Sequence, residues 1–171
     1  MPDSNEQEWA AEAERILSIT IRELEETLQR FERAGGKVLR RPTEDPSLLK
    51  TVQSVLGLQF PNPVQAFYRL YECLQVGSYE FVWIRLLPDL AAKIRVRRPE
   101  IPRHYLPALA DGMGGYYFVV CAEEKSPLPL DFGSVVYNPG GHPTILETCN
   151  SDFLDFVATQ VEKQFQDLHP V

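Results

Sequence analysis

Several features that would assign this chain to a common class are scarce or missing from its 171 residues. The longest uninterrupted apolar run, Tyr116 to Ala122, is far shorter than the roughly 20 residues that a membrane-spanning helix needs. The first residues, MPDSNEQEWA, lack the basic and then apolar character of a secretory signal. We therefore expect a cytoplasmic protein that has no membrane partner.

Cysteine and histidine are equally scarce, with three of each. The cysteines have no paired spacing, which excludes a disulfide framework and a zinc signature, and the histidines form no HxxxH or HExxH arrangement. There is also no GxSxG elbow. We expect no metal, no cofactor and no enzyme. One remote catalytic alternative stays open, a hydrolase that pairs His142 with Cys149 or Cys121, because such pairs meet in space rather than in sequence.

Basic side chains are rare in the C-terminal third of the chain. Residues 106–171 carry nine acidic groups against Lys125 and Lys163 alone, whereas KIRVRRPEIPRH, residues 93–104, is a basic cluster. A charge run of this kind is usually a solvated face, and an acidic chain disfavours nucleic acid. We therefore expect a basic protein partner and no nucleic acid.

Hydrophobic periodicity predicts a long N-terminal helix over residues 5–34. Leu17, Ile21, Leu24, Leu28 and Phe31 follow the spacing of one helical stripe, and Gly35-Gly36 supplies the freedom that ends a helix. We expect this stripe to pack on the core of the chain itself rather than on a partner helix. RRPTEDP, residues 40–46, is expected to be a connector, so residues 1–45 are expected to form an N-terminal helical extension.

In the middle of the chain the hydrophobic pattern changes once, from one typical of helices to one typical of a strand. We expect a short helix over residues 48–56 that Gly57 closes, and a second helix that runs from Asn62 through Leu74. YEFVWIRLL, residues 79–87, is aromatic and β-branched, which predicts a central strand covered on both faces.

The C-terminal half alternates apolar strands with turns. Strands are expected over Tyr105–Ala110, Tyr116–Cys121, SVVY at 134–137 and TILE at 144–147, before a helix that begins near Ser151. Helices and strands are therefore segregated along the chain. This order predicts a single α+β domain in which a largely antiparallel mixed sheet of about five or six strands is flanked by helices.

ALADGMGGYYFVV, residues 108–120, contains three glycines and could be taken for a phosphate-binding loop. Such a loop precedes a helix and carries a Lys-Ser or Lys-Thr pair, whereas this one precedes a strand and has neither. We expect a hairpin turn in which Asp111 bonds forward to backbone amides.

A face near the two hairpins is the predicted protein-binding site, since its acidic groups would attract a basic partner. The candidate residues are Asp111, Tyr116, Tyr117, Glu123, Glu124, Asp131, His142 and Glu147.

Three segments together resemble the SUKH superfamily, which contains the fungal cell-wall-assembly regulator and many bacterial toxin-immunity proteins. LLKTVQSVLGLQFPNPVQAFYRLYECL resembles the short helix ending in Leu-Gly and the proline-led helix of the family; LPALADGMGGYYFVV resembles its core hairpin. GSVVYNPGGHPTILETCNSDFLDFV resembles its last strand pair and helix, but where the family often has an Asp-His-Glu-like group this chain has NPGGHP, in which only His142 is similar.

The resemblance extends from about Leu48 to Phe165 and implies that residues 46–171 form a SUKH-like α+β domain. It also implies a non-catalytic protein that binds and neutralises a toxin enzyme, commonly a nuclease. The alternative is a regulatory scaffold of the same fold that acts in cell-wall or signalling regulation.

Overall fold

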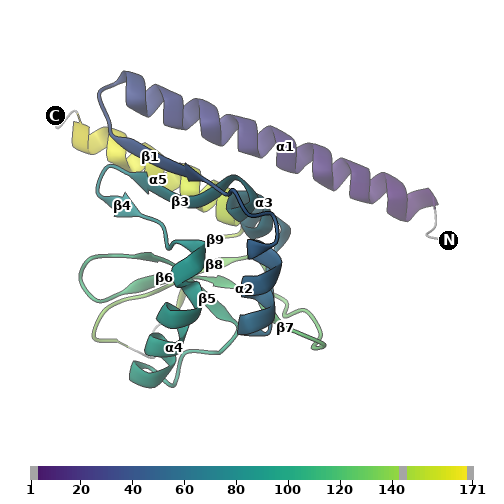
Figure 1. Ribbon diagram of the computed structural model, residues 1–171. Coiled ribbons are helices and arrows are strands. Elements are labelled where there is room, and N and C mark those ends of the chain that lie inside the picture. The colour runs from purple at the N-terminus through teal and green to yellow at the C-terminus, as the bar shows by residue number, and fades with distance from the viewer. Residues whose placement is uncertain (1–3, 143–145, 169–171) are drawn as a thin grey trace.

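The computed structural model describes residues 4–142 and 146–168, which form five α-helices and three antiparallel β-sheets (Figure 1). The helices are α1 (Ser4–Arg33), α2 (Leu48–Leu56), α3 (Asn62–Leu70), α4 (Leu87–Arg97) and α5 (Phe153–Leu168), with a 3-10 turn η1 (Ile84–Leu86) before α4. The strands are β1 (Val38–Pro42), β2 (Leu58–Gln59), β3 (Tyr71–Val76), β4 (Tyr79–Glu80), β5 (Tyr105–Ala110), β6 (Tyr116–Val120), β7 (Ala122–Glu123), β8 (Val135–Asn138) and β9 (Glu147–Asn150). The expected α+β class is confirmed, and the strands pair as β1-β3-β4, β2-β7 and β5-β6-β8-β9.

The second half of α1 packs against α5, as the sequence predicted for the helical stripe. Leu24, Leu28 and Phe31 are buried in the main core. Phe31 meets Phe165 of α5 edge-on, with 5.2 Å between the ring centroids. The guanidinium of Arg30 lies 5.5 Å from the centre of the Phe165 ring. The N-terminal segment and the rest of the chain therefore share one core.

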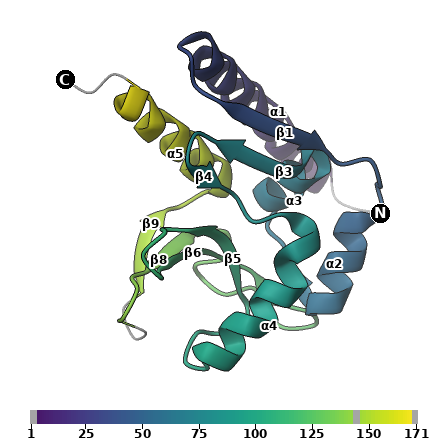
Figure 2. The same ribbon diagram turned by 60° about the vertical axis from the view of Figure 1, so that its left-hand side comes forward.

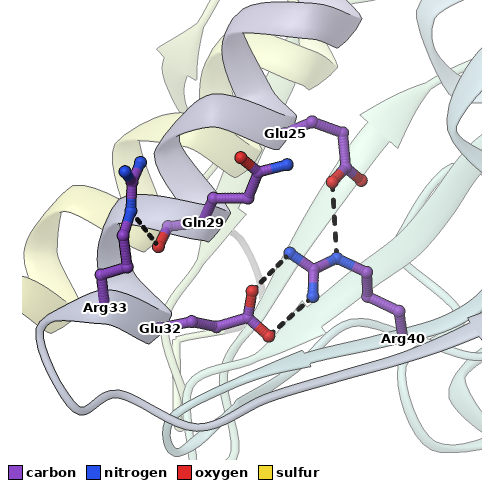
Figure 3. A network of polar contacts seen from close by, with 5 residues as sticks. All are labelled: Glu25, Gln29, Glu32, Arg33 and Arg40. Atoms are coloured by element: carbon purple, nitrogen blue, oxygen red, sulfur yellow. Dashed lines mark hydrogen bonds and ion pairs between the residues drawn. The ribbon is translucent and has the colours of Figure 1, made fainter.

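The segment after α1 returns along that helix as strand β1. Figure 3 shows Arg40 of β1 between two carboxylates of α1, with 2.9 Å from Nη1 to Glu32 Oε1 and 3.5 Å from Nε to Glu25 Oε2. The hydrogen bond from Arg40 to Glu32 raises the pKa of Arg40, although its partial burial opposes this shift. The prediction that residues 40–46 form only a connector is wrong for 40–42, because these residues pair with β3.

The four-stranded sheet β5-β6-β8-β9 is covered on both faces (Figure 2). Side chains alternate along a strand, so Val119 of β6 packs in the main core with α5, whereas Phe118 and Val120 pack in a second cluster with Ile94 of α4. This double coverage accounts for the nearly unbroken apolar sequence of β6.

The helix expected from Asn62 through Leu74 is α3, which ends at Leu70, and residues 71–76 form strand β3 instead. Strand β3 lies at the centre of the β1-β3-β4 sheet, and its first four residues are buried. Tyr71 and Leu74 fit a helical stripe locally, but the hydrogen bonds from β1, which are distant in sequence, decide the outcome.

The strand expected over residues 79–87 is also wrong beyond Glu80. Only Tyr79 and Glu80 pair with β3, and η1 then leads into α4. Pro88 lies in the first turn of α4, where its missing amide would have had no helical partner. That proline was the helix-start signal, and it outweighed the β-branched composition.

The last hairpin and helix follow the expected order. Strand β8 begins one residue later than predicted, β9 begins at Glu147, and Thr144 and Ile145 of the predicted strand lie outside the described residues. Asp152 rather than Ser151 caps α5, since its Oδ1 accepts the amide hydrogen of Asp155 at 3.1 Å.

Candidate functional site

The turn between β5 and β6 is built around the carboxylate of Asp111. Asp111 Oδ1 accepts the backbone amides of Met113 at 2.7 Å and Gly115 at 2.8 Å. Gly112 and Gly114 have φ angles of 79° and 91°, which glycine adopts with little strain. The amides that a phosphate would need are therefore bound to the side chain of the turn itself. The expected role of Asp111 as a turn residue agrees with these contacts.

Asp111 also belongs to a polar cluster, here called the turn cluster, with Arg98, Tyr137 and Asn138. Tyr137 donates its hydroxyl hydrogen to Asp111 Oδ2 at 2.7 Å. Arg98, which follows α4, donates a hydrogen bond from Nη1 to Asn138 Oδ1 and another from Nη2 to the carbonyl oxygen of Gly114 at 2.5 Å. Asn138 is fully buried and donates to the carbonyl of His142 at 3.0 Å. The turn cluster thus connects α4 to both hairpin turns.

The contacts in the turn cluster shift the pKa values of Asp111 and Tyr137. Partial burial acts to raise the pKa of Asp111, but the hydrogen bonds from Tyr137 and two backbone amides, with the charge of Arg98, hold that pKa below its ordinary value. The hydrogen bond to Asp111 raises the pKa of Tyr137 to about 12. Asp111 therefore stays ionised and Tyr137 stays protonated at neutral pH.

The two hairpin turns also touch through their backbones. A Cβ atom added to Gly140 would collide with the carbonyl oxygen of Met113 and lie 3.1 Å from the carbonyl carbon of Gly114. A Cβ atom added to Gly115 would lie 2.8 Å from the carbonyl oxygen of Asn138. Glycine at these two positions permits an approach that fixes one turn relative to the other.

Beside the turn cluster lies a groove of about 610 Å³, here called the α4 groove. It runs between β4, the start of α4 and the end of β5, and this volume falls within the range of ligand-binding sites. Its walls include the apolar residues Tyr79, Val82, Trp83, Leu86 and Leu90. Glu80, Asp89 and Asp111 place three carboxylates around it, against one ammonium from Lys93.

Trp83 is the aromatic residue of this groove with an unused donor. Its Nε1 atom is buried, yet it has no hydrogen-bond partner in the part of the chain that the structure describes. The sequence pattern gave no sign of Trp83 and Glu80 as site residues, because residues 79–87 were predicted to form one strand covered on both faces. Pro88 marks the start of α4 and is the local signal against a strand that continues through Leu87. No local signal singled out Asp89.

The eight predicted partner-binding residues lie in three places: three near the hairpin turns, three at the other end of the sheet, and two half-buried tyrosines on β6. Asp111 and His142 lie at the two hairpin turns, and Glu147 pairs with Tyr137 nearby. Glu123, Glu124 and Asp131 lie at the opposite end of the sheet, beyond β6, which is about 17 Å long. The eight residues therefore do not form one continuous surface.

The two predicted tyrosines lie on opposite faces of β6. Tyr117 packs against the main core, with its ring tilted against those of Tyr137 and Phe156 at centroid distances of 4.7 Å and 5.0 Å. Tyr116 packs against the second cluster, 6.0 Å from Phe118. Both are half-buried and hold the sheet against its covering helices.

The Cys-His alternative receives little support from the thiols. Burial raises the pKa of Cys121, which is fully buried, and of Cys149, which donates to the carbonyl of Val135 at 3.3 Å. A nucleophilic cysteine needs a lowered pKa. Within residues 4–142 and 146–168, no three His, Cys, Asp or Glu side chains gather as metal ligands would.

The basic cluster after residue 92 is partly structural. Arg98 belongs to the turn cluster, and Arg95 donates to the carbonyl of Arg103 at 3.0 Å.

The described helices include none that is both long and apolar enough to cross a bilayer. Compared with known proteins, the chain matches no family model and has no significant match among curated proteins.

Proposed function

We propose that this chain is a non-catalytic protein-binding domain whose α4 groove receives a basic segment of a partner protein. The observation that carries the proposal is the lining of the groove, in which Trp83 and other apolar residues occur together with the side chains of Glu80, Asp89 and Asp111. An aromatic residue beside carboxylates suits an arginine or lysine side chain, which gains cation–π and ionic contacts together.

The turn cluster supports this proposal because it holds one wall of the groove in place. Asp111 lines the groove and is fixed by three hydrogen bonds. A surface that is already ordered loses less entropy on binding than a mobile loop does.

An immunity-type protein that neutralises a toxin enzyme is the form of this function that we propose. The acid-rich C-terminal third supports it, since nucleases and other enzymes that act on nucleic acid carry basic surfaces. The resemblance to the SUKH superfamily and the expected cytoplasmic location agree with it and remain predictions.

The test is to purify this chain with the candidate toxins encoded beside its gene and to measure toxin activity with increasing amounts of the chain. We expect stoichiometric inhibition, which Glu80→Lys with Asp89→Lys removes and Glu123→Lys with Glu124→Lys retains. If no neighbouring toxin is bound or inhibited, the immunity proposal fails. Binding without inhibition would favour the regulatory scaffold.

A further inference from the structure

The first half of α1 is the largest part of the molecule without a packing partner. Helix α1 has 30 residues and α5 has 16, so α1 is about 45 Å long and α5 about 24 Å. Figure 1 shows the N-terminal part of α1 running past the other elements. Every residue from Asn5 to Ile16 is exposed.

The apolar stripe that packs on α5 continues into this free half. Trp9 is 78% exposed and Ile16 is 53% exposed. In the free half the stripe consists of Trp9, Ala10, Ala13 and Ile16, and it joins the packed half at Leu17 and Thr20, which are half-buried. An exposed tryptophan on a continuous apolar stripe is typical of an interface, since tryptophan is enriched among residues that dominate binding.

A groove of about 550 Å³, here called the α1 groove, opens beside this stripe. Ala10, Ala13 and Leu17 form its α1 wall, and Pro63 of α3 and Leu154 of α5 lie across from them. The groove is large enough for an indole ring. The same helix therefore carries an exposed aromatic side chain and a recess that fits one.

We infer that a second copy of this chain occupies the α1 groove, with the free halves of two α1 helices paired antiparallel. A two-fold axis at Ala13 places Trp9 of one copy opposite Leu17 of the other, inside the α1 groove. Ala10 and Ala13 lie at the crossing, where small side chains let two helices approach closely.

The charges around the α1 groove complement those of the α1 helix of a second copy. The far wall of the α1 groove contains Arg69 and the N-terminal turns of α3 and α5, whose dipoles are positive at that end. The incoming helix carries Glu6 and Glu8 next to Trp9. Glu14 and Asp152 also line the groove, but Asp152 is bonded to the amide of Asp155.

The interface is small, because four turns of helix and one groove cover less than the roughly 800 Å² per partner of a standard complex. We therefore expect a reversible dimer with a micromolar dissociation constant. This inference is independent of the proposed function, since it uses neither the α4 groove nor a foreign partner.

The first experiment is light scattering on the full chain from about 2 μM to about 200 μM, a range that brackets such constants. The mass is expected to rise from 19.5 kDa toward twice that value. Trp9→Ala is expected to weaken association at least tenfold, whereas Val96→Ala, at a site 83% exposed on α4, leaves it unchanged. A monomeric mass throughout, or a dimer that Trp9→Ala leaves intact, overturns the inference.

The second experiment locates the two-fold axis with a short bis-maleimide crosslinker in a Cys149→Ser background, since Cys149 is the exposed native cysteine among the three. Ala13→Cys is expected to crosslink at least ten times faster than Ala11→Cys, which lies on the opposite face of α1. Equal rates overturn the antiparallel arrangement.

Discussion

The two ends of the four-stranded sheet hold their acidic residues in different ways. At the turn end, residues 111–115 and 139–142, the carboxylate of Asp111 accepts three hydrogen bonds and the turns meet backbone to backbone. At the loop end, residues 123–131, the carboxylates of Glu123, Glu124 and Asp131 accept no hydrogen bond and form no ion pair among the described residues.

This difference separates two uses of negative charge. Charges that point into solvent act at long range, where they speed the encounter with a basic partner and are screened by salt. A charge fixed within a cluster can instead organise a surface for direct contact. Under the proposed function, we therefore expect binding at the α4 groove beside the turn end and long-range attraction from the loop end.

The largest effect is expected on stability. Asp111→Ala removes the acceptor for two amides and for the Tyr137 hydroxyl, and is expected to lower the free energy of unfolding by about 2–3 kcal/mol. Asp131→Ala at the loop end is expected to change it by less than about 0.5 kcal/mol. Urea denaturation measures both, and equal losses would show that the two ends do not differ.

The next largest effect concerns affinity for a protein partner. Trp83→Ala removes the aromatic wall of the α4 groove and is expected to weaken binding about 30-fold, the loss typical of a dominant interface residue. Leu128→Ala, an exposed apolar residue at the loop end, serves as the control and is expected to leave affinity unchanged. Calorimetry measures both variants, and a larger loss for Leu128→Ala would move the site to the loop end.

A smaller effect is expected on association kinetics. Glu123→Lys with Glu124→Lys is expected to slow association about threefold at low salt and to leave dissociation unchanged, because these carboxylates act through space. Glu80→Lys with Asp89→Lys is expected to speed dissociation as well. Surface plasmon resonance at two salt concentrations separates the rates, and an unchanged association rate would remove Glu123 and Glu124 from the attracting surface.

The smallest expected effect is on the way folding stability depends on pH. Since the folded pKa of Asp111 lies below its value in the unfolded chain, near 3.9, its ionised form stabilises the fold above about pH 4. This contribution is lost as the pH falls through the lower folded pKa. Asp111→Asn should lack it, so the stability difference between the two proteins should narrow below pH 4 in denaturation curves. A constant difference would contradict the assignment.

Local sequence signals predicted much of the fold. The α1 stripe, the Gly57 helix end and the strand at Tyr105–Ala110 were predictable from local signals, namely helix periodicity, a left-handed glycine and a short apolar run before a turn. Strand β3 was not, because Tyr71 and Leu74 satisfy a helix locally and only pairing with β1 makes them a strand.

The candidate site was predictable only in part. The bond from Asp111 to its own turn amides is local, and the sequence indicated it. The α4 groove joins β4, α4 and β5, whose contact depends on how the chain turns between them, so Trp83 and Asp89 gave no local sign of sharing a surface with Asp111. The same limit made Glu123 and Asp111 look like one acidic face, although β6 separates them.

The most direct test of the assignment of binding to the turn end is an NMR titration of the full chain with an alternating Arg-Leu pentapeptide, with a Glu-Leu pentapeptide of equal apolar content as control. We expect the Arg-Leu peptide to shift the Trp83 indole resonance and the amide resonances of residues 79–93 most, and the control peptide to leave them unchanged. Larger shifts at residues 123–131, or equal shifts with both peptides, would contradict this assignment.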